Sequence, residues 1–179
     1  MKISKTQFIS QMEAQINEQI AFVNELKSLS DHELSARSSA DSWNVMQIVE
    51  HMHLTMKLYT DQFEAKSFDR GSEDYVSINW KGRFFAEGMR PKENKIRYKM
   101  KTTNVFRPQA QDSAFTLFDG TITVMSDFIE QGKTSIWQGH KVVSALGPLV
   151  KFQIAEAVNF LLAHNERHIQ QIKNVLNTA

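Results

Sequence analysis

Four long stretches of the chain repeat hydrophobic residues every three or four positions, which is the spacing of an amphipathic helix. They run from Ser4 to about Lys27, from near Trp43 to about Ala65, from about Ser113 to Glu130, and from Gly147-Pro148 to about Leu176. Asp41 or Ser42 suits the N-cap of the second helix, and proline suits the first position of the fourth, which should be the longest. A short helical turn should follow Ser30, because Ser30 and Glu33 have the spacing of a capping box.

The segment from Lys66 to Asp112, between the second and third predicted helices, is almost fifty residues long and has no helical period. It is too long for a tight turn between antiparallel neighbours, so it can cross the whole bundle. The chain has only 7 Gly and 3 Pro, and it shows no internal repeat. We therefore predict an all-α four-helix bundle, formed by a single domain over residues 1–179.

The overall charge and hydropathy exclude some classes of function. A formal net charge of +1 gives the whole chain no attraction to nucleic acid or to an anionic membrane. The N-terminus lacks an apolar signal region, and no later stretch approaches the roughly 20 apolar residues of a transmembrane helix. We therefore expect a soluble cytoplasmic protein that binds neither nucleic acid nor membrane.

Positive charge is nevertheless concentrated in residues 81–107. This segment holds Lys81, Arg83, Arg90, Lys92, Lys95, Arg97, Lys99, Lys101 and Arg107 against Glu87 and Glu93. It could form a rim that attracts an anionic substrate, or a solvated surface that balances the acidic helices, and we favour the solvated surface. A nucleic-acid groove is a weak alternative, because only Tyr98 supplies a stackable ring between Lys95 and Lys101.

The histidines are the strongest candidates for a metal site. The chain contains no Cys, which excludes a disulfide framework and any Cys-ligated zinc or iron–sulfur site. His164 and His168 lie four residues apart in the fourth predicted helix, so their side chains share one face. They extend the hydrophobic stripe of Leu161 and Val175, which points them into the bundle interior, where a polar group needs a partner.

A third histidine can join this pair if the second and fourth helices pack antiparallel. His51 lies about 12 Å into the second helix, and the pair lies about 12 to 18 Å before the end of the fourth, so all three meet at one level. We exclude His53, which points elsewhere, and His32 and His140, which lie outside the long helices.

Three imidazoles from two helices, with further positions left for water, are typical of an open or catalytic divalent-metal site. The alternative is a set of core histidines that bond to each other, to Gln47 or Gln171, or to the backbone. In a metal site, Gln47 or Gln171 could orient a ligand, although surface exposure is equally consistent.

Glu50 and Glu166 should point away from the site, and Trp43 should pack the end of the bundle. Met46, Met52 and Met56 are interpreted as core or dimer-interface residues.

These same residues resemble the DinB/YfiT superfamily along nearly the whole chain. The resemblance rests on Asp41-Ser42-Trp43, on His51 eight positions after the tryptophan, on Gly82-Arg83-Phe84-Phe85 in the crossover, and on the closing segment Phe160–Ile172 with its histidine pair. It implies an up-down-down-up bundle with the long crossover between helices two and three, usually as a homodimer. It also implies that His51, His164 and His168 bind zinc, nickel or a similar divalent ion.

The resemblance leaves the reaction open, because one fold hosts several activities. Relatives include S-transferases that use low-molecular-weight thiols and proteins classed as metal-dependent hydrolases. Our first hypothesis is a metal-dependent enzyme in which the ion activates water or a thiol toward a small-molecule substrate. The second is a non-catalytic dimeric bundle that binds a metal or ligand for stability or stress sensing. The third is a structural bundle with hydrogen-bonded core histidines and no metal.

Overall fold

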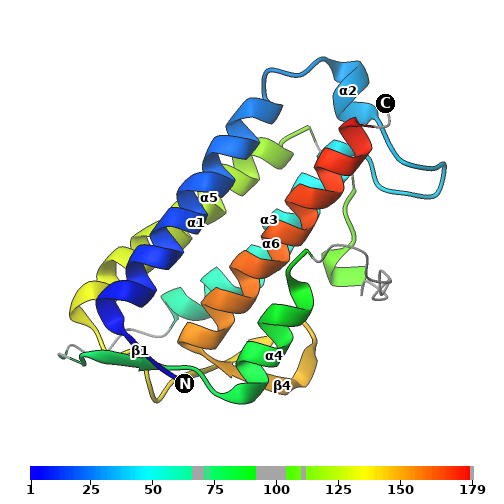
Figure 1. Ribbon diagram of the computed structural model, residues 1–179. Helices are drawn as coiled ribbons and strands as arrows, with labels where there is room; N and C mark the ends of the chain where they lie inside the picture. The colour runs from blue at the N-terminus through cyan, green and yellow to red at the C-terminus, as the bar shows by residue number, and fades with distance from the viewer. Residues whose placement is uncertain (66–70, 72, 92–103, 110–111, 178–179) are drawn as a thin grey trace.

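The computed structural model describes residues 1–65, 71, 73–91, 104–109 and 112–177 (Figure 1). This part of the chain is mostly helical, as predicted. Its long helices are α1 (Lys5–Leu26), α3 (Val45–Glu64), α5 (Ala114–Gln131) and α6 (Ile154–Leu176). Each of the four contacts two of the others, α1 and α3 both lying against α5 and α6. The bounds agree with the prediction for the first three and differ at the start of the last.

The hydrophobic faces of these helices form one core, which explains why they assemble. The buried members of α3 include Val45, Ile48, Val49, Met52, Tyr59 and Phe63. Met56 is also buried and Met46 is half-buried, in line with their interpretation as core residues. Burying apolar surface of this kind is the main favourable contribution to folding.

Helix α3 begins within two residues of the predicted Trp43, at Val45, but uses a different cap. Asn44, not Asp41 or Ser42, is the N-cap, and its side chain accepts a hydrogen bond from the Gln47 backbone amide at 2.8 Å. The Gln47 side chain accepts one in return from the Asn44 amide at 3.0 Å. This reciprocal pair is a capping box, in which Asn and Gln take the places of the more familiar Ser and Glu. The predicted capping box of Ser30 and Glu33 is present and starts the short helix α2 (Asp31–Ser35).

The last helix does not begin at Gly147-Pro148, as predicted. Those residues start strand β4 (Gly147–Gln153), which pairs antiparallel with β3 (Lys141–Ser144). Gly147 has φ +122°, a left-handed conformation that suits glycine at the end of a hairpin turn. Pro148 follows in a two-stranded sheet, where a residue without an N–H can lie on an unpaired edge. Helix α6 starts only at Ile154, with Gln153 as its N-cap.

The crossover is also more structured than predicted. It contains helix α4 (Trp80–Met89), which packs against α6, and strand β2 (Tyr75–Ser77), which pairs antiparallel with β1 (Lys2–Ser4). The helical period was obscured because Trp80 and Phe84 are exposed, and because Gly82 and Gly88 lower helix propensity. Much of the basic segment 81–107 lies outside the described residues.

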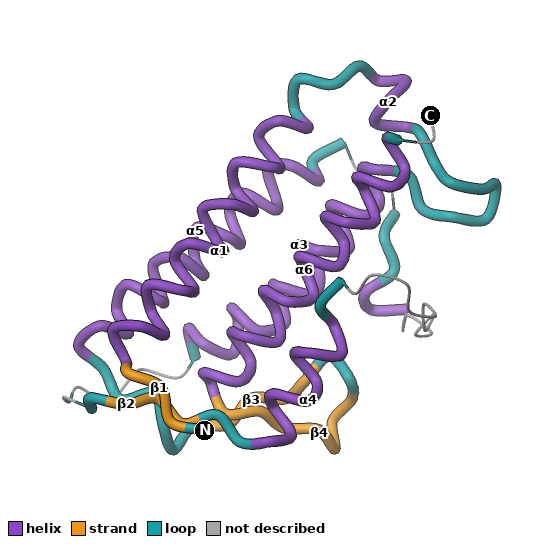
Figure 2. Tube along the Cα trace, viewed as in Figure 1, coloured by secondary structure: helices purple, strands orange, loops and turns teal. Residues whose placement is uncertain are grey.

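The strands gather at one end of the long helices (Figure 2). Helix α2 and the C-terminal end of α6 lie at the opposite end. The N-terminal end of α3 is also there, since α2 packs against α3. This end of the molecule therefore brings the first turns of α3 close to the last turns of α6.

Candidate metal centre

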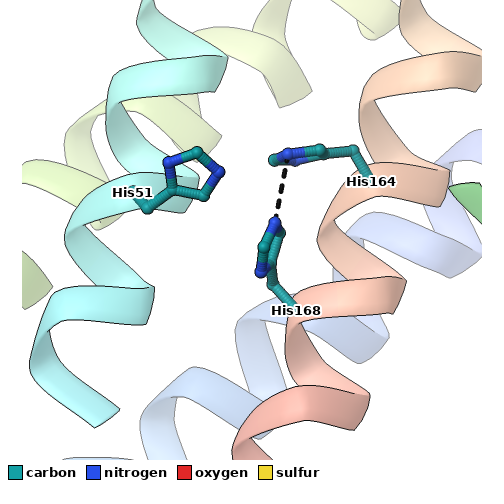
Figure 3. Close-up of side chains that lie close together, drawn as sticks. All are labelled: His51, His164 and His168. Atoms are coloured by element: carbon teal, nitrogen blue, oxygen red, sulfur yellow. Dashed lines mark hydrogen bonds between the residues drawn. The ribbon is translucent and has the colours of Figure 1, made fainter. Parts of the chain in front are cut away.

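Helices α3 and α6 bring together the three predicted histidines. His51 points inward from α3, and His164 and His168 point toward it from successive turns of α6 (Figure 3). The ring centroids of the α6 pair are 4.4 Å apart, and the His51 ring lies 4.7 Å from His168 and 5.3 Å from His164. One nitrogen from each ring lies within 4.8 Å of the other two. All three side chains are buried, so the cluster could hold a metal ion.

A backbone carbonyl sets the protonation of His51. Its Nδ1 lies 2.7 Å from the carbonyl oxygen of Phe106, in the short 3-10 helix Asn104–Phe106. A carbonyl oxygen only accepts, so Nδ1 carries the proton and donates it. In the neutral ring, Nε2 then has the free lone pair that a metal ion requires.

A side-chain amide acts in the same way on His168. Its Nδ1 donates to Oε1 of Gln171 at 3.0 Å, which leaves Nε2 as an acceptor. That Nε2 lies 3.2 Å from Nε2 of His164, so His164 supplies the proton between them. Of the two glutamines considered from the sequence, Gln171 therefore orients a histidine, whereas Gln47 caps α3.

Burial keeps the three imidazoles neutral. Burial, together with the neighbouring rings, lowers the pKa of His168 to about 3 and that of His164 well below its usual value. Burial also lowers the pKa of His51, although the hydrogen bond to Phe106 partly opposes this shift. Imidazoles bind metals only in the neutral form, so the cluster is in the protonation state that a metal needs.

The donor set fits a divalent ion. Two of the three rings are held in the tautomer that presents Nε2 to the cluster. His164 holds its proton on Nε2 in the bond to His168, and its buried Nδ1 has no hydrogen-bond partner among the described residues, so this ring presents Nε2 to a metal once the proton moves to Nδ1. Three neutral nitrogen donors from two helices leave room in the coordination sphere for water or substrate, as in open sites.

Two aromatic rings border the cluster. The Trp43 ring lies 4.8 Å from the His51 ring, and Phe160 stacks on His164 with centroids 6.4 Å apart. Trp43 therefore packs at this end of the helices, as predicted, but it does so directly against a candidate ligand. Apolar walls of this kind limit water and strengthen electrostatic interactions inside a site.

The other titratable residues considered from the sequence point elsewhere. Glu50 is buried and accepts a hydrogen bond from the Gln109 backbone amide at 2.8 Å. Glu166 pairs with Arg90 of the crossover at 2.6 Å. His53 bonds to Thr121 on α5 through Nδ1 at 2.7 Å.

The remaining two histidines also lie outside the cluster. His32 is exposed on α2, and His140 precedes β3. Excluding these two and His53 from the cluster therefore agrees with the structure.

Sequence analysis missed the contribution of Phe106. The carbonyl that orients His51 carries no signal in the sequence, because every residue has one. Its position depends on how the end of the crossover returns to α3, which contacts this 3-10 helix. The one local signal was the spacing of Gln171, three residues after His168, which places both on the same helix face.

The family of the chain follows from a comparison with family models. Residues 17–172 match the DinB superfamily, which is most of the chain, so the protein belongs to the DinB superfamily. The resemblance inferred from the tryptophan and histidine spacing is thereby confirmed. No curated protein and no solved structure matched the chain. In the part of the chain that the structure describes, no helix has the length and apolar character needed to cross a membrane.

Proposed function

We propose that the protein binds one divalent metal ion, zinc or nickel, through His51, His164 and His168, and acts as a metal-dependent enzyme. The observation that carries the proposal is the paired orientation of His51 and His168. Phe106 and Gln171 each accept an Nδ1 proton, which turns both Nε2 atoms toward the third histidine. The same bonds would hold in a hydrogen-bonded core without a metal, so the metal content of the protein distinguishes the two.

The reaction we propose is hydrolysis or S-transfer with a low-molecular-weight thiol. When bound, a divalent ion would supply Lewis acidity and lower the pKa of a water or thiol nucleophile. Phe106 and Gln171 hold the histidine ligands in place, and Trp43 and Phe160 limit the access of water to the site. Because the chain has no Cys, any thiol that reacts here must come from another molecule.

Membership of the DinB superfamily supports two further proposals about the assembly. We propose that α1, α3, α5 and α6 form an up-down-down-up bundle, with the crossover between α3 and α5. The pairwise contacts of these helices support this topology. We also propose a homodimer, which sedimentation equilibrium of the full chain would test by its molecular mass.

The first experiment is elemental mass spectrometry on tag-free protein after reconstitution with zinc or nickel. We expect about one equivalent per chain in the wild type, and loss of the metal in His51→Ala and His164→Ala. His53→Ala is the matched control, because His53 is also buried on α3 but bonds to α5. Absence of metal from the reconstituted wild type would contradict the proposal.

The second experiment separates an enzyme from a non-catalytic metal-binding bundle. The reconstituted protein would be screened for ester and amide hydrolysis, and for transfer of thiols to electrophilic substrates, with the metal-free protein as reference. Activity that requires the metal and is lost in His51→Ala supports the enzyme. Full metal occupancy without activity in either screen favours the non-catalytic bundle.

A further inference from the structure

A pocket of about 680 Å³ opens beside the histidine cluster, at the N-terminal end of α3. One wall comes from the loop before α3, with Arg37, Asp41 and Trp43. The other comes from the end of the crossover, with Arg107 and Gln109. The pocket is open to solvent and its lining is mostly polar, so it suits a polar ligand better than an apolar one.

Each wall of this pocket is connected to the histidine cluster through one contact. Trp43 lines the pocket, and its ring lies 4.8 Å from the His51 ring. Arg107 directly follows Phe106, whose carbonyl accepts the His51 proton. A molecule bound in the pocket would therefore lie next to the residues that hold His51.

The charges in the pocket favour an anion. Within the described ranges, neither the Arg37 nor the Arg107 guanidinium has a hydrogen bond or an ion pair, and both side chains are exposed. Among the described residues that line the pocket, Asp41 is the one carboxylate, which leaves a net positive charge there. A guanidinium presents a planar set of donors that matches the oxygens of a carboxylate or a phosphate.

We propose that this pocket binds the anionic group, a carboxylate or a phosphate, of the small-molecule substrate. Asp41 and the neutral side chains of Gln47 and Gln109 provide hydrogen-bonding groups for the rest of the molecule. The statement that this anion belongs to a substrate rests on the proposed function, because it assumes that the reacting end of the bound molecule lies at the metal. The binding of an anion by the two arginines does not rest on it.

The test uses succinate and inorganic phosphate as separate probes on the full-length metal-free protein, followed by NMR of the indole N–H signals. The chain has 3 Trp, and Trp43 is the one in the pocket. Trp137 is buried and donates its indole N–H to the Gly132 carbonyl, so its signal reports on folding. We expect a saturable shift of the Trp43 signal with at least one probe, while Trp137 stays unchanged. The more effective probe distinguishes a carboxylate ligand from a phosphate ligand.

Variants identify the residues responsible. Arg37→Gln and Arg107→Gln should each weaken binding about tenfold, because each removes a charge-assisted pair. Arg83→Gln, which removes an exposed arginine on α4 outside the pocket, should bind like the wild type. No saturable shift with either probe, or equal affinity in all three variants, would overturn the proposal.

The metal content of the same variants separates this proposal from the proposed function. We expect Arg37→Gln and Arg107→Gln to retain the full metal equivalent after reconstitution, since neither side chain is a ligand. Anion binding without any metal binding by the wild type would refute the proposed function and leave the anion pocket intact. Full metal binding without anion binding would refute the pocket alone.

Discussion

His51 donates its Nδ1 proton to the carbonyl oxygen of Phe106 at 2.7 Å, across 55 positions of the chain. The neighbouring Glu50 accepts the backbone amide of Gln109 at 2.8 Å, so two adjacent residues of α3 hold the end of the crossover. This double attachment connects the candidate metal site to the pocket that contains Arg107. It is the reason why the crossover belongs to the site and is more than a connection between helices.

Gln171 should control metal affinity through His168. Replacing it by leucine removes the acceptor of the Nδ1 proton, and losses of such partners usually cost about 10- to 100-fold in metal affinity. Gln171→Glu keeps an acceptor and should retain the affinity. Gln170→Leu is the matched control, because the Gln170 side chain is exposed and donates to Asn174 on the same helix, away from His168. Competition with a zinc chelator measures the affinity, and equal values for Gln171→Leu and Gln170→Leu would argue against this role.

Metal removal should lower the thermal stability of the protein. A ligand present at about 1,000 times its Kd adds about 4 kcal/mol to the free energy of unfolding, which raises Tm by about 10 °C in a chain of this size. We expect this rise when zinc is added to the metal-free wild type, and its reversal by a chelator. His53→Ala should show the same rise, and His164→Ala should show none. Differential scanning calorimetry gives the values, and a zinc-dependent rise in His164→Ala would contradict the assignment.

The metal-free protein should lose stability as the pH falls. The pKa of His168 is about 3 in the folded protein against a usual value of 6.5, so between these values the unfolded chain binds a proton that the folded chain does not. The stability from this residue is therefore complete above pH 6.5 and is lost toward pH 3, by about 1.4 kcal/mol per pH unit for one such group. His164 acts in the same direction.

Urea unfolding at pH 7.5, 6.5, 5.5 and 4.5 would measure this dependence. His168→Asn should show a shallower fall in the free energy of unfolding than the wild type. His32→Asn, which changes an exposed histidine of α2, should follow the wild type. If the slopes of all three proteins agree, the folded protein does not hold His168 neutral.

Gly82 should be required for the contact between α4 and α6. A Cβ at this position would lie 2.5 Å from Cγ and 2.9 Å from Cβ of Glu156. The buried Glu156 carboxylate cannot easily move, because it accepts the backbone amides of Asn79 and Gln153. We expect Gly82→Ala to lower the free energy of unfolding by about 1–3 kcal/mol.

Gly88 offers the matched control on the same helix. A Cβ there meets nothing within 4 Å, so Gly88→Ala should raise the free energy of unfolding by about 0.5–1 kcal/mol through helix propensity. Chemical unfolding of both variants gives the comparison. A neutral Gly82→Ala would mean that the two helices separate enough to admit a methyl group.

The hydrophobic period of the chain determined the long helices and the faces that they bury. Helical spacing is a local property, so the bounds of α1, α3 and α5 could be predicted within about two residues. The spacing of His164 and His168 is equally local, because a helix alone places them on one face. His51 could be added because it lies as far into α3 as the pair lies from the end of α6.

The predicted start of the last helix was wrong, because the local sequence there fits two structures. Gly147-Pro148 suits the start of a helix and also a turn followed by an edge strand, and only the pairing of β3 with β4 decides between them. Likewise, α4 is stabilised by packing against α6 and by the fit of Gly82 to Glu156. Its own segment is only 10 residues long, contains two glycines and exposes Trp80 and Phe84, so the local pattern did not predict it.

The tertiary structure alone decided how the candidate site is completed. The Phe106 carbonyl and Arg107 come from the end of the crossover, which is distant in the sequence from Arg37, Trp43 and His51. A carbonyl carries no side-chain signal, and the position of Arg37 opposite Arg107 depends on the path of the crossover. The sequence therefore determined which residues could bind a metal. Packing of the crossover against α3 decided the tautomer of His51 and the charged pocket beside it.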